Sequence, residues 1–236
     1  MKIIGIIPAR MESSRLPGKP LIDIGGKSMI KRVYESVLNS KLFNKVIVAT
    51  PNKVIYDHVK DFGKVIMTSN NPLNGTERVF EAYKNLDNEY DFIVNIQGDE
   101  PFIKKEQLSD IISICRKPNQ ICTLIKKEKY SKNLERESIM KVVINNKNEA
   151  MYFSRSLIPY QKKKKNYFKH ICIYAYDPIT LKNIISLPPS SLEISESLEQ
   201  LRWLENEFKI KVKITNSDSF SVDTKEDLIL AKNYVN

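Results

Sequence analysis

The sequence has few of the features that mark secreted, metal-clustered or membrane-spanning proteins. It has three cysteines in 236 residues, Cys115, Cys122 and Cys172, and their spacing fits no metal-ligand motif. An odd number of scattered cysteines favours reduced thiols over a disulfide framework. No apolar run approaches the ~20 residues of a membrane span, and the N-terminal apolar run does not resemble a cleaved signal peptide. We therefore predict a cytoplasmic protein with no membrane insertion.

Nucleic-acid-binding motifs are also absent, although the net charge is +10. The longest basic run is Lys162 to Lys165, and a second group contains Lys126, Lys127 and Lys129. No aromatic residues alternate with these lysines, as they do in single-strand binders. We interpret the lysines as solvated surface charge and predict no nucleic-acid partner.

Short apolar runs alternate with amphipathic segments over the first half of the chain. Strands are expected at residues 2–7, 45–50, 65–69 and 92–96, and helices at residues 29–42, 52–62, 76–86 and 104–116. The length suits one domain, and the 42% hydrophobic content suffices for an ordinary core. This rhythm predicts an α/β fold with a doubly wound, mostly parallel sheet.

The pattern changes near residue 120, where helices become rarer. Strands are expected at residues 121–125, 141–145, 151–154, 171–176 and 209–215, and helices at residues 178–187, 190–207 and 224–235. Thr224 is placed to cap the last helix. The sequence contains no repeat and no Gly/Ser linker. We expect a single domain over residues 1–236, in which residues 121–190 form a mixed α/β insertion that serves as a lid or dimer surface.

The segment after the first expected strand has the composition of a phosphate-binding loop. Arg10, Arg15 and Lys19 alternate there with Ser13, Ser14 and Gly18. Fixed cations and free backbone N–H groups at the carboxyl end of a strand can neutralise a polyphosphate. A solvated basic loop is the alternative, but the ordered proline, glycine and cation spacing favours phosphate binding.

Residues 25–28, Gly-Gly-Lys-Ser, end like a P-loop but do not form one. A P-loop needs a glycine five residues before its Gly-Lys pair, and Leu21 occupies that position. We predict a turn here, followed by a helix that Ser28 caps.

Asp99 lies just beyond the strand expected at residues 92–96, where ligands bind in open α/β sheets. A carboxylate facing a triphosphate is repelled unless a cation lies between them, which makes Mg²⁺ the natural third component. The alternative is an ordinary turn with a capping aspartate. Asp223 is either a second ligand of the same metal or a helix N-cap, and sequence spacing does not choose between these roles.

Several further residues have side chains that suit ligand binding. Gly75 and Thr76 begin an expected helix, whose N-terminus can contact an anion or a base. Arg155 could pair with a carboxylate in bidentate fashion. His170 beside an apolar run is more often a packed core residue than a catalyst. Glu199 and Gln200 could equally belong to a solvated helix face.

Together these motifs resemble the 3-deoxy-manno-octulosonate cytidylyltransferases, the CMP-Kdo synthetases, along nearly the whole chain. The matching motifs include Ile7-Pro8-Ala9-Arg10, Ser14-Arg15-Leu16-Pro17-Gly18-Lys19-Pro20-Leu21, Gly75-Thr76-Glu77-Arg78, Gln97-Gly98-Asp99-Glu100-Pro101, Tyr152-Phe153-Ser154-Arg155, Leu198-Glu199-Gln200-Leu201-Arg202 and Val222-Asp223-Thr224. The opening motif is shared with other sugar nucleotidylyltransferases. The resemblance implies the nucleotide-diphospho-sugar transferase fold and a homodimer that serves lipopolysaccharide synthesis.

The resemblance also implies a reaction in which a 2-keto-3-deoxy sugar acid attacks CTP to give a CMP-sugar and pyrophosphate. It implies that Arg10, Lys19 and Asp99 are catalytic, and that Asp99 and Asp223 hold Mg²⁺. The implied nucleotide-binding residues are Pro8, Ala9, Arg10, Arg15, Lys19, Thr76 and Gln97. The implied sugar-binding residues are Arg155, His170, Glu199 and Gln200. Two alternatives stay open: a transferase for another sugar acid such as a nonulosonate, and a basic nucleic-acid-binding protein with a degenerate nucleotide fold.

Overall fold

A computed structural model describes residues 1–13, 15–87, 89–116, 120–163, 165–218 and 220–235. Ser14 of the basic loop and Lys164 of the lysine run lie outside these residues. The chain divides into two compact units. Unit 1 contains residues 1–108 and 218–236, and unit 2 contains residues 109–217. The stretch interpreted as an insertion lies within unit 2.

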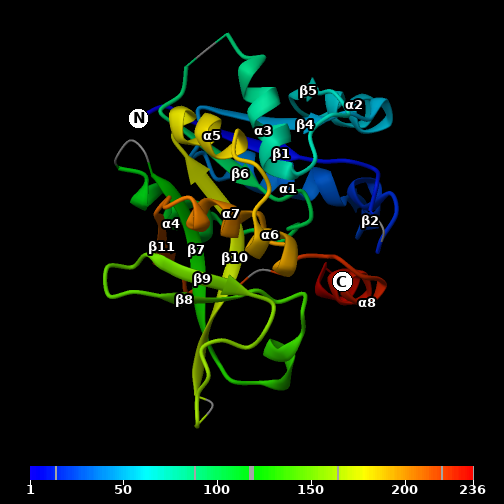
Figure 1. The fold of residues 1–236 in the computed structure, drawn as a ribbon. Coiled ribbons are helices and arrows are strands. Elements are labelled where there is room, and N and C mark those ends of the chain that lie inside the picture. The colour runs from blue at the N-terminus through cyan, green and yellow to red at the C-terminus, as the bar shows by residue number, and fades with distance from the viewer. Residues whose placement is uncertain (14, 88, 117–119, 164, 219, 236) are drawn as a thin grey trace. The chain divides into compact units, whose positions relative to one another are not determined.

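Unit 1 is built on a parallel sheet, shown in blue to green in Figure 1. Its strands run in the order β6-β1-β4-β5, and each neighbouring pair is parallel. They are β1 (Ile3–Pro8), β4 (Lys45–Thr50), β5 (Val65–Met67) and β6 (Phe92–Ile96). Nearly every residue of β1, β4 and β6 is buried, as expected for parallel strands that are covered on both faces. The predicted mostly parallel α/β fold is confirmed.

The first three helices of unit 1 alternate with its strands, and the fourth follows unit 2 near the end of the chain. They are α1 (Met29–Asn39), α2 (Lys53–Lys60), α3 (Gly75–Lys84) and α8 (Lys225–Val235), with a short 3₁₀ turn η1 (Lys19–Leu21). Ser28 caps α1 by accepting a hydrogen bond from Lys31 N. The Gly25-Gly26 pair is the turn between β2 (Asp23–Ile24) and β3 (Lys27–Ser28). The prediction of a turn and a helix cap, instead of a P-loop, is therefore confirmed.

The strands of unit 2 pair mainly in the antiparallel sense. Strand β7 (Ile121–Lys129) pairs in parallel with β11 (Ile210–Ile214) and antiparallel with β10 (Asn166–Tyr176). Strand β8 (Lys141–Ile144) is antiparallel to both β10 and β9 (Ala150–Ser154). The remaining elements are η2 (Lys132–Glu135), α5 (Pro178–Ile185), α6 (Ser191–Glu196) and α7 (Glu199–Glu205); α4 (Lys105–Ile114) contains the boundary between the units.

Two predictions about unit 2 are wrong in detail. The single helix expected at residues 190–207 is two helices, because Ser197 has φ 52° in the left-handed region and ends α6. Strands β7 and β10 also extend beyond the predicted ends, since their polar outer residues pair with each other, as Asn166 does with Lys129. All three cysteines are free, as predicted. None of the helices in the described part of the chain is long and apolar enough to cross a membrane.

Candidate active site

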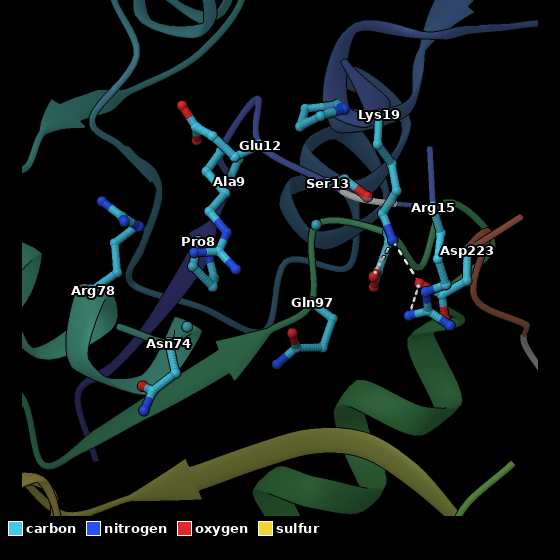
Figure 2. A pocket seen from close by; sticks show the side chains of 15 residues that line it. Pro8, Ala9, Glu12, Ser13, Arg15, Lys19, Asn74, Arg78, Gln97 and Asp223 are labelled. Atoms are coloured by element: carbon cyan, nitrogen blue, oxygen red, sulfur yellow. Dashed lines mark hydrogen bonds and ion pairs between the residues drawn. The ribbon is translucent and has the colours of Figure 1, made fainter. Parts of the chain in front are cut away.

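A pocket of about 550 Å³ opens in unit 1 at the carboxyl ends of β1 and β6 (Figure 2). It brings together eight of the residues predicted from the sequence: Pro8, Ala9, Arg10, Arg15, Lys19, Gln97, Asp99 and Asp223. Its other lining residues are Glu12, Ser13, Pro20, Asn74, Gly75, Arg78 and Gly98. The volume and the mixture of cations and carboxylates suit a charged small molecule.

The basic loop is shaped by backbone contacts at both of its ends. Ala9 N donates to Ala49 O at 2.9 Å, which extends the pairing of β1 by one residue. Met11 N donates to Asn52 Oδ1 at 2.9 Å, and Gly18 N donates to Met11 O at 3.2 Å. Gly18 has φ 69°, a conformation that glycine adopts without steric cost. The loop therefore closes on itself at the mouth of the pocket.

Asp223 reaches the pocket because the segment before α8 is tied to the end of β6. Val222 N donates to Asp99 O at 2.9 Å. The Val222 side chain is fully buried in an apolar cluster with Leu16 and Met29. This packing fixes the neighbouring Asp223 beside Asp99, although more than a hundred residues separate the two aspartates in the sequence.

Lys19 lies between the two aspartates. Its Nζ donates to Asp99 Oδ2 at 2.6 Å and to Asp223 Oδ1 at 2.8 Å. Arg15 Nη2 donates to the same Asp223 oxygen at 3.1 Å, and Figure 2 shows both cations converging on Asp223. The cap of α8 is Thr224, as predicted, because Thr224 Oγ1 accepts from Asp227 N. The helix-cap alternative for Asp223 is therefore excluded.

The ionisation of these groups follows from their mutual contacts. Burial acts to lower the pKa of Lys19, but Asp99 and Asp223 outweigh it, so the pKa lies above its usual value. Burial acts to raise the pKa of Asp223, but Lys19 and Arg15 hold that pKa below its usual value. The site thus keeps full charges of both signs at neutral pH.

Two pocket residues sit where β6 meets β1 and α3. A Cβ atom added to Gly98 would lie 2.9 Å from Pro8 O, so glycine permits the close approach of these two segments. Gln97 Nε2 donates to Asn95 Oδ1 at 3.3 Å. Asn95 Nδ2 in turn donates to Thr76 Oγ1 at 3.4 Å. Thr76, the second residue of α3, is buried and is not one of the residues that line the pocket, and its nucleotide contact stays a prediction.

Arg78 is a pocket residue that the sequence analysis did not assign to the site. Its side chain is buried, and Nη1 donates to Thr68 Oγ1 at 2.6 Å and to Ser69 O at 3.1 Å. Burial and the nearby Arg10 lower the pKa of Arg78. Arg78 lies directly before Val79 in the buried stripe of α3. The sequence feature that could have identified Arg78 as a site residue is a charged side chain on the apolar face of a predicted helix.

The carboxylates of Asp99 and Asp223 fit a Mg²⁺ ion, because both already share one cation, Lys19. Among the described residues, no group of three His, Cys, Asp or Glu side chains could hold a metal. Mg²⁺ is commonly bound by one or two carboxylates together with substrate phosphates and water. The donor set therefore suits a metal that is completed by a nucleotide.

Arg155 in unit 2 is tied to main-chain carbonyl groups. Its guanidinium donates to Glu196 O at 2.7 Å, Glu137 O at 2.9 Å and Ser197 O at 3.2 Å. The Glu196 carboxylate accepts from Arg155 N and from Ser154 Oγ. Arg155 thus joins the end of β9 to two other segments of unit 2, and its contact with a sugar carboxylate stays a prediction.

The other predicted sugar-binding residues lie on β10 and α7. His170 is buried, its Nε2 is 2.9 Å from Thr123 Oγ1, and burial lowers its pKa to about 3. Glu199 begins α7, and the next residue, Gln200, is buried. Within the described part of the chain, Gln200 Nε2 and the buried Tyr174 hydroxyl have no hydrogen-bond partner. Unpaired buried groups of this kind are rare unless a ligand or water binds them.

Comparison with known proteins identifies the family. The sequence model described as cytidylyltransferase matches residues 4–213. A protein of Parabacteroides distasonis named 3-deoxy-manno-octulosonate cytidylyltransferase is 50% identical over 97% of this chain and 96% of its own length. The chain belongs to the 3-deoxy-manno-octulosonate cytidylyltransferase family. A Fusobacterium nucleatum protein of the same name is 44% identical over 100% of this chain and 97% of its own length.

Solved structures agree with this family assignment. A CMP:2-keto-3-deoxy-manno-octonic acid synthetase complexed with CTP superimposes with a TM-score of 0.91, at 38% identity, over 99% of this chain and 98% of its own. A 4-diphosphocytidyl-2C-methyl-D-erythritol synthase from Anaerococcus prevotii gives a TM-score of 0.67 at 19% identity, over 99% of this chain and 98% of its own. The second likeness concerns the fold alone.

Proposed function

We propose that the chain transfers CMP from CTP to 3-deoxy-manno-octulosonate and releases pyrophosphate. The observation that carries this proposal is the convergence of Arg15, Lys19, Asp99 and Asp223 in one pocket at the carboxyl edge of a parallel sheet. Cations for a triphosphate and carboxylates for its metal are there side by side. The names of the family relatives supply the nucleotide and the sugar acid.

In this reaction the anomeric hydroxyl oxygen of the sugar acid bonds to the α-phosphorus of CTP. The bond from that phosphorus to the oxygen bridging to the β-phosphate breaks, pyrophosphate leaves, and the hydroxyl proton is released to solvent. Negative charge increases on the leaving group, so the cations of Arg10, Arg15 and Lys19 stabilise the transition state more than the ground state. Positioning and charge suffice for phosphoryl chemistry, and no side-chain nucleophile is required.

Asp99 and Asp223 are proposed to hold Mg²⁺, which when bound neutralises phosphate charge and polarises the reacting phosphoryl group. Pro8, Ala9, Gln97 and Thr76 are proposed to contact the cytidine. Among these four, the first three line the pocket.

The sugar acid is proposed to contact Arg155, His170, Glu199 and Gln200. The unpaired amide of Gln200 supports this role, because a hydroxylated ligand would satisfy it. His170 is neutral at physiological pH, so it would contribute a hydrogen bond and not a charge. A bidentate contact from Arg155 to the sugar carboxylate would have to replace two of its carbonyl contacts.

We further propose that the chain acts as a homodimer in the cytoplasm, and that its CMP-sugar feeds lipopolysaccharide synthesis. Light scattering coupled to size-exclusion chromatography tests the dimer directly.

The decisive experiment measures pyrophosphate release with CTP, Mg²⁺ and a panel of sugar acids, followed by mass identification of the CMP-linked product. The expected result is turnover only when CTP, Mg²⁺ and 3-deoxy-manno-octulosonate are present together. Preferential turnover of a nonulosonate, or of UTP over CTP, would replace the proposed substrate with another. No turnover with any member of the panel would overturn the proposal.

A further inference from the structure

We propose that the Lys19 ammonium is an internal counter-ion that occupies the position a divalent metal needs, so that metal binds tightly only when nucleotide phosphates draw Lys19 away. The proposal rests on the metal site of the proposed function and adds a role for Lys19 before the nucleotide arrives. It starts from the contacts of a single atom, Lys19 Nζ, with Asp99 and Asp223. Figure 2 labels Lys19 and Asp223.

The contacts of Lys19 leave no room for a second cation at the same oxygens. Its Nζ is 2.6 Å from Asp99 Oδ2 and 2.8 Å from Asp223 Oδ1. A Mg²⁺ ion bound by these oxygens would lie about 2.0–2.1 Å from each of them. The ammonium and the metal therefore compete for the same pair of oxygens.

The competition is strong because the ammonium is shielded from water. The Lys19 side chain is 14% exposed, and those of Asp99 and Asp223 are 26% and 20% exposed. Charge pairs in such surroundings are screened far less than surface pairs. A metal that enters alone would have to displace Lys19 and leave its ammonium without a counter-charge, which is unfavourable.

A triphosphate removes this penalty by offering Lys19 and Arg15 a different anion. Both cations contact Asp223 in the structure, so the two carboxylates are balanced by two cations. When phosphate oxygens take over the two cations, the carboxylates are released for the metal. The exchange keeps every charge paired at each stage.

This exchange moves the side chains of Arg15 and Lys19, and for Lys19 no backbone movement is needed. Its backbone is held in η1, where Ile22 N donates to Lys19 O at 3.2 Å and Leu21 N donates to Gly18 O at 3.0 Å. The four-carbon stem of lysine is flexible and can turn the ammonium from the carboxylates toward a bound phosphate. The loop therefore needs no rearrangement to bind nucleotide.

The consequence is a reciprocal coupling between metal and nucleotide. Because each ligand changes the affinity for the other by the same factor, Mg²⁺ should tighten nucleotide binding as much as nucleotide tightens Mg²⁺ binding. Replacing Lys19 by an uncharged residue removes the competitor and should weaken the coupling in both directions, because metal then binds well without nucleotide.

The test measures Mn²⁺ binding by electron paramagnetic resonance near neutral pH, with and without a non-hydrolysable CTP analogue. Lys19→Met is expected to bind Mn²⁺ alone at least about tenfold more tightly than the wild type. Lys27→Met is the matched control, because Lys27 Nζ lies 2.6 Å from Glu35, outside the pocket lining, and this change should leave Mn²⁺ affinity unaltered. In the wild type, the analogue should increase Mn²⁺ affinity by a similar factor.

Thermal unfolding provides a second measurement in case Lys19→Met folds poorly. With Asp99 deprived of Lys19 and Asp223 left with Arg15 alone, this variant should be destabilised, and Mn²⁺ alone should restore its melting temperature while barely changing that of the wild type. Lys19→Arg, which keeps the charge, should behave like the wild type in both assays.

The outcomes separate this proposal from the metal site itself. If Lys19→Met binds Mn²⁺ no better than the wild type while Asp99→Asn abolishes binding, the counter-ion role is overturned and the metal site stands. If Mn²⁺ binds to none of these proteins even with the analogue, the metal site and the counter-ion role are both overturned.

Discussion

The two units of the chain pair their cations with different kinds of acceptor. In unit 1, Lys19 and Arg15 are paired with the carboxylates of Asp99 and Asp223. In unit 2, Lys141 and Arg155 are paired with main-chain carbonyl oxygens. The Lys141 ammonium donates to Ile139 O at 2.6 Å, Arg136 O at 3.3 Å and Arg155 O.

The difference is that the cations of unit 1 can exchange their partners, whereas those of unit 2 cannot. A carboxylate that loses its lysine can take a metal, and the lysine can take a phosphate, so all charges stay paired. A main-chain carbonyl oxygen that loses its lysine or arginine donor has no comparable new partner. A buried oxygen left without a hydrogen-bond donor destabilises the fold. The side chain of Lys141 is fully buried, and burial lowers its pKa against the attraction of Glu196. We therefore expect changes in unit 1 to alter activity, and changes around Lys141 to alter stability.

The largest expected effect comes from Asp99→Asn, which removes one of the proposed metal ligands. We expect kcat/KM for CMP-sugar formation to fall by at least about a hundredfold, because a lost ligand removes stabilisation that develops in the transition state. Steady-state pyrophosphate release measures this effect. Asp57→Asn, on a surface carboxylate paired with Lys53 and Lys60, is the control. A rate for Asp99→Asn within about threefold of the wild type would contradict the metal role.

Lys141→Met should mainly affect folding. It removes the ammonium donor from three partly buried carbonyl groups, of which Arg136 O keeps a second donor in Ile139 N. We therefore expect the free energy of unfolding to fall by about 3 kcal/mol. Urea denaturation followed by circular dichroism measures the loss. Lys211→Met is the control, since its ammonium also donates to a carbonyl, Lys147 O, but at an exposed position. Equal losses of unfolding free energy for the two variants would show that the carbonyl contacts of Lys141 stabilise the fold no more than the exposed contact of Lys211.

His170 should make unit 2 sensitive to acid. Burial puts its pKa at about 3 in the folded chain, below the usual 6.5, so the unfolded chain takes up a proton first as the pH falls. The stability that neutral His170 contributes to the folded chain is complete above about pH 6.5 and is lost as the pH falls toward 3. Between about pH 7.5 and about pH 5 we expect stability to fall by about 2 kcal/mol.

Urea unfolding at several pH values tests this expectation with His170→Gln, which keeps a hydrogen-bonding group near Thr123 but does not titrate. The variant should show a flatter dependence on pH over the same range. An unchanged pH dependence would mean that His170 is accessible to protons in the folded chain.

Thr224→Ala should have the smallest effect. It removes the cap that Thr224 Oγ1 provides to Asp227 N at the start of α8, which costs about 1 kcal/mol of stability. Since Asp223 directly precedes this cap, KM for CTP should rise while kcat changes little. Ser28→Ala, which uncaps α1 instead, should cost similar stability without the change in KM.

Local signals in the sequence predicted most of unit 1. Buried apolar runs predicted β1, β4 and β6, and the caps at Ser28 and Thr224 were readable because they depend on neighbours within one helical turn. The break at Ser197 was missed, because a left-handed serine leaves no mark in the hydrophobic pattern. The ends of β7 and β10 were missed because polar residues there are held by cross-strand pairing.

Long-range contacts limited the prediction of the site. The sequence indicated that Asp99 and Asp223 had suitable chemistry, but their proximity depends on one backbone hydrogen bond, from Val222 N to Asp99 O, and on burial of Val222. The carbonyl contacts of Arg155 could not be predicted either. Every residue has a main-chain carbonyl, so the sequence does not mark which of them accepts a hydrogen bond. Arg78 was overlooked because its partners, Thr68 and Ser69, lie before the helix that carries it.

The bridge from Lys19 to Asp223 spans 204 positions of the chain, and this separation has a kinetic consequence. Contacts between such distant residues require the closure of a long loop, and chains dominated by them fold slowly. During refolding from denaturant, helical circular dichroism should therefore recover before the ability to bind CTP. A chain between these two stages would have the helical circular dichroism of the native protein and yet be unable to bind the nucleotide.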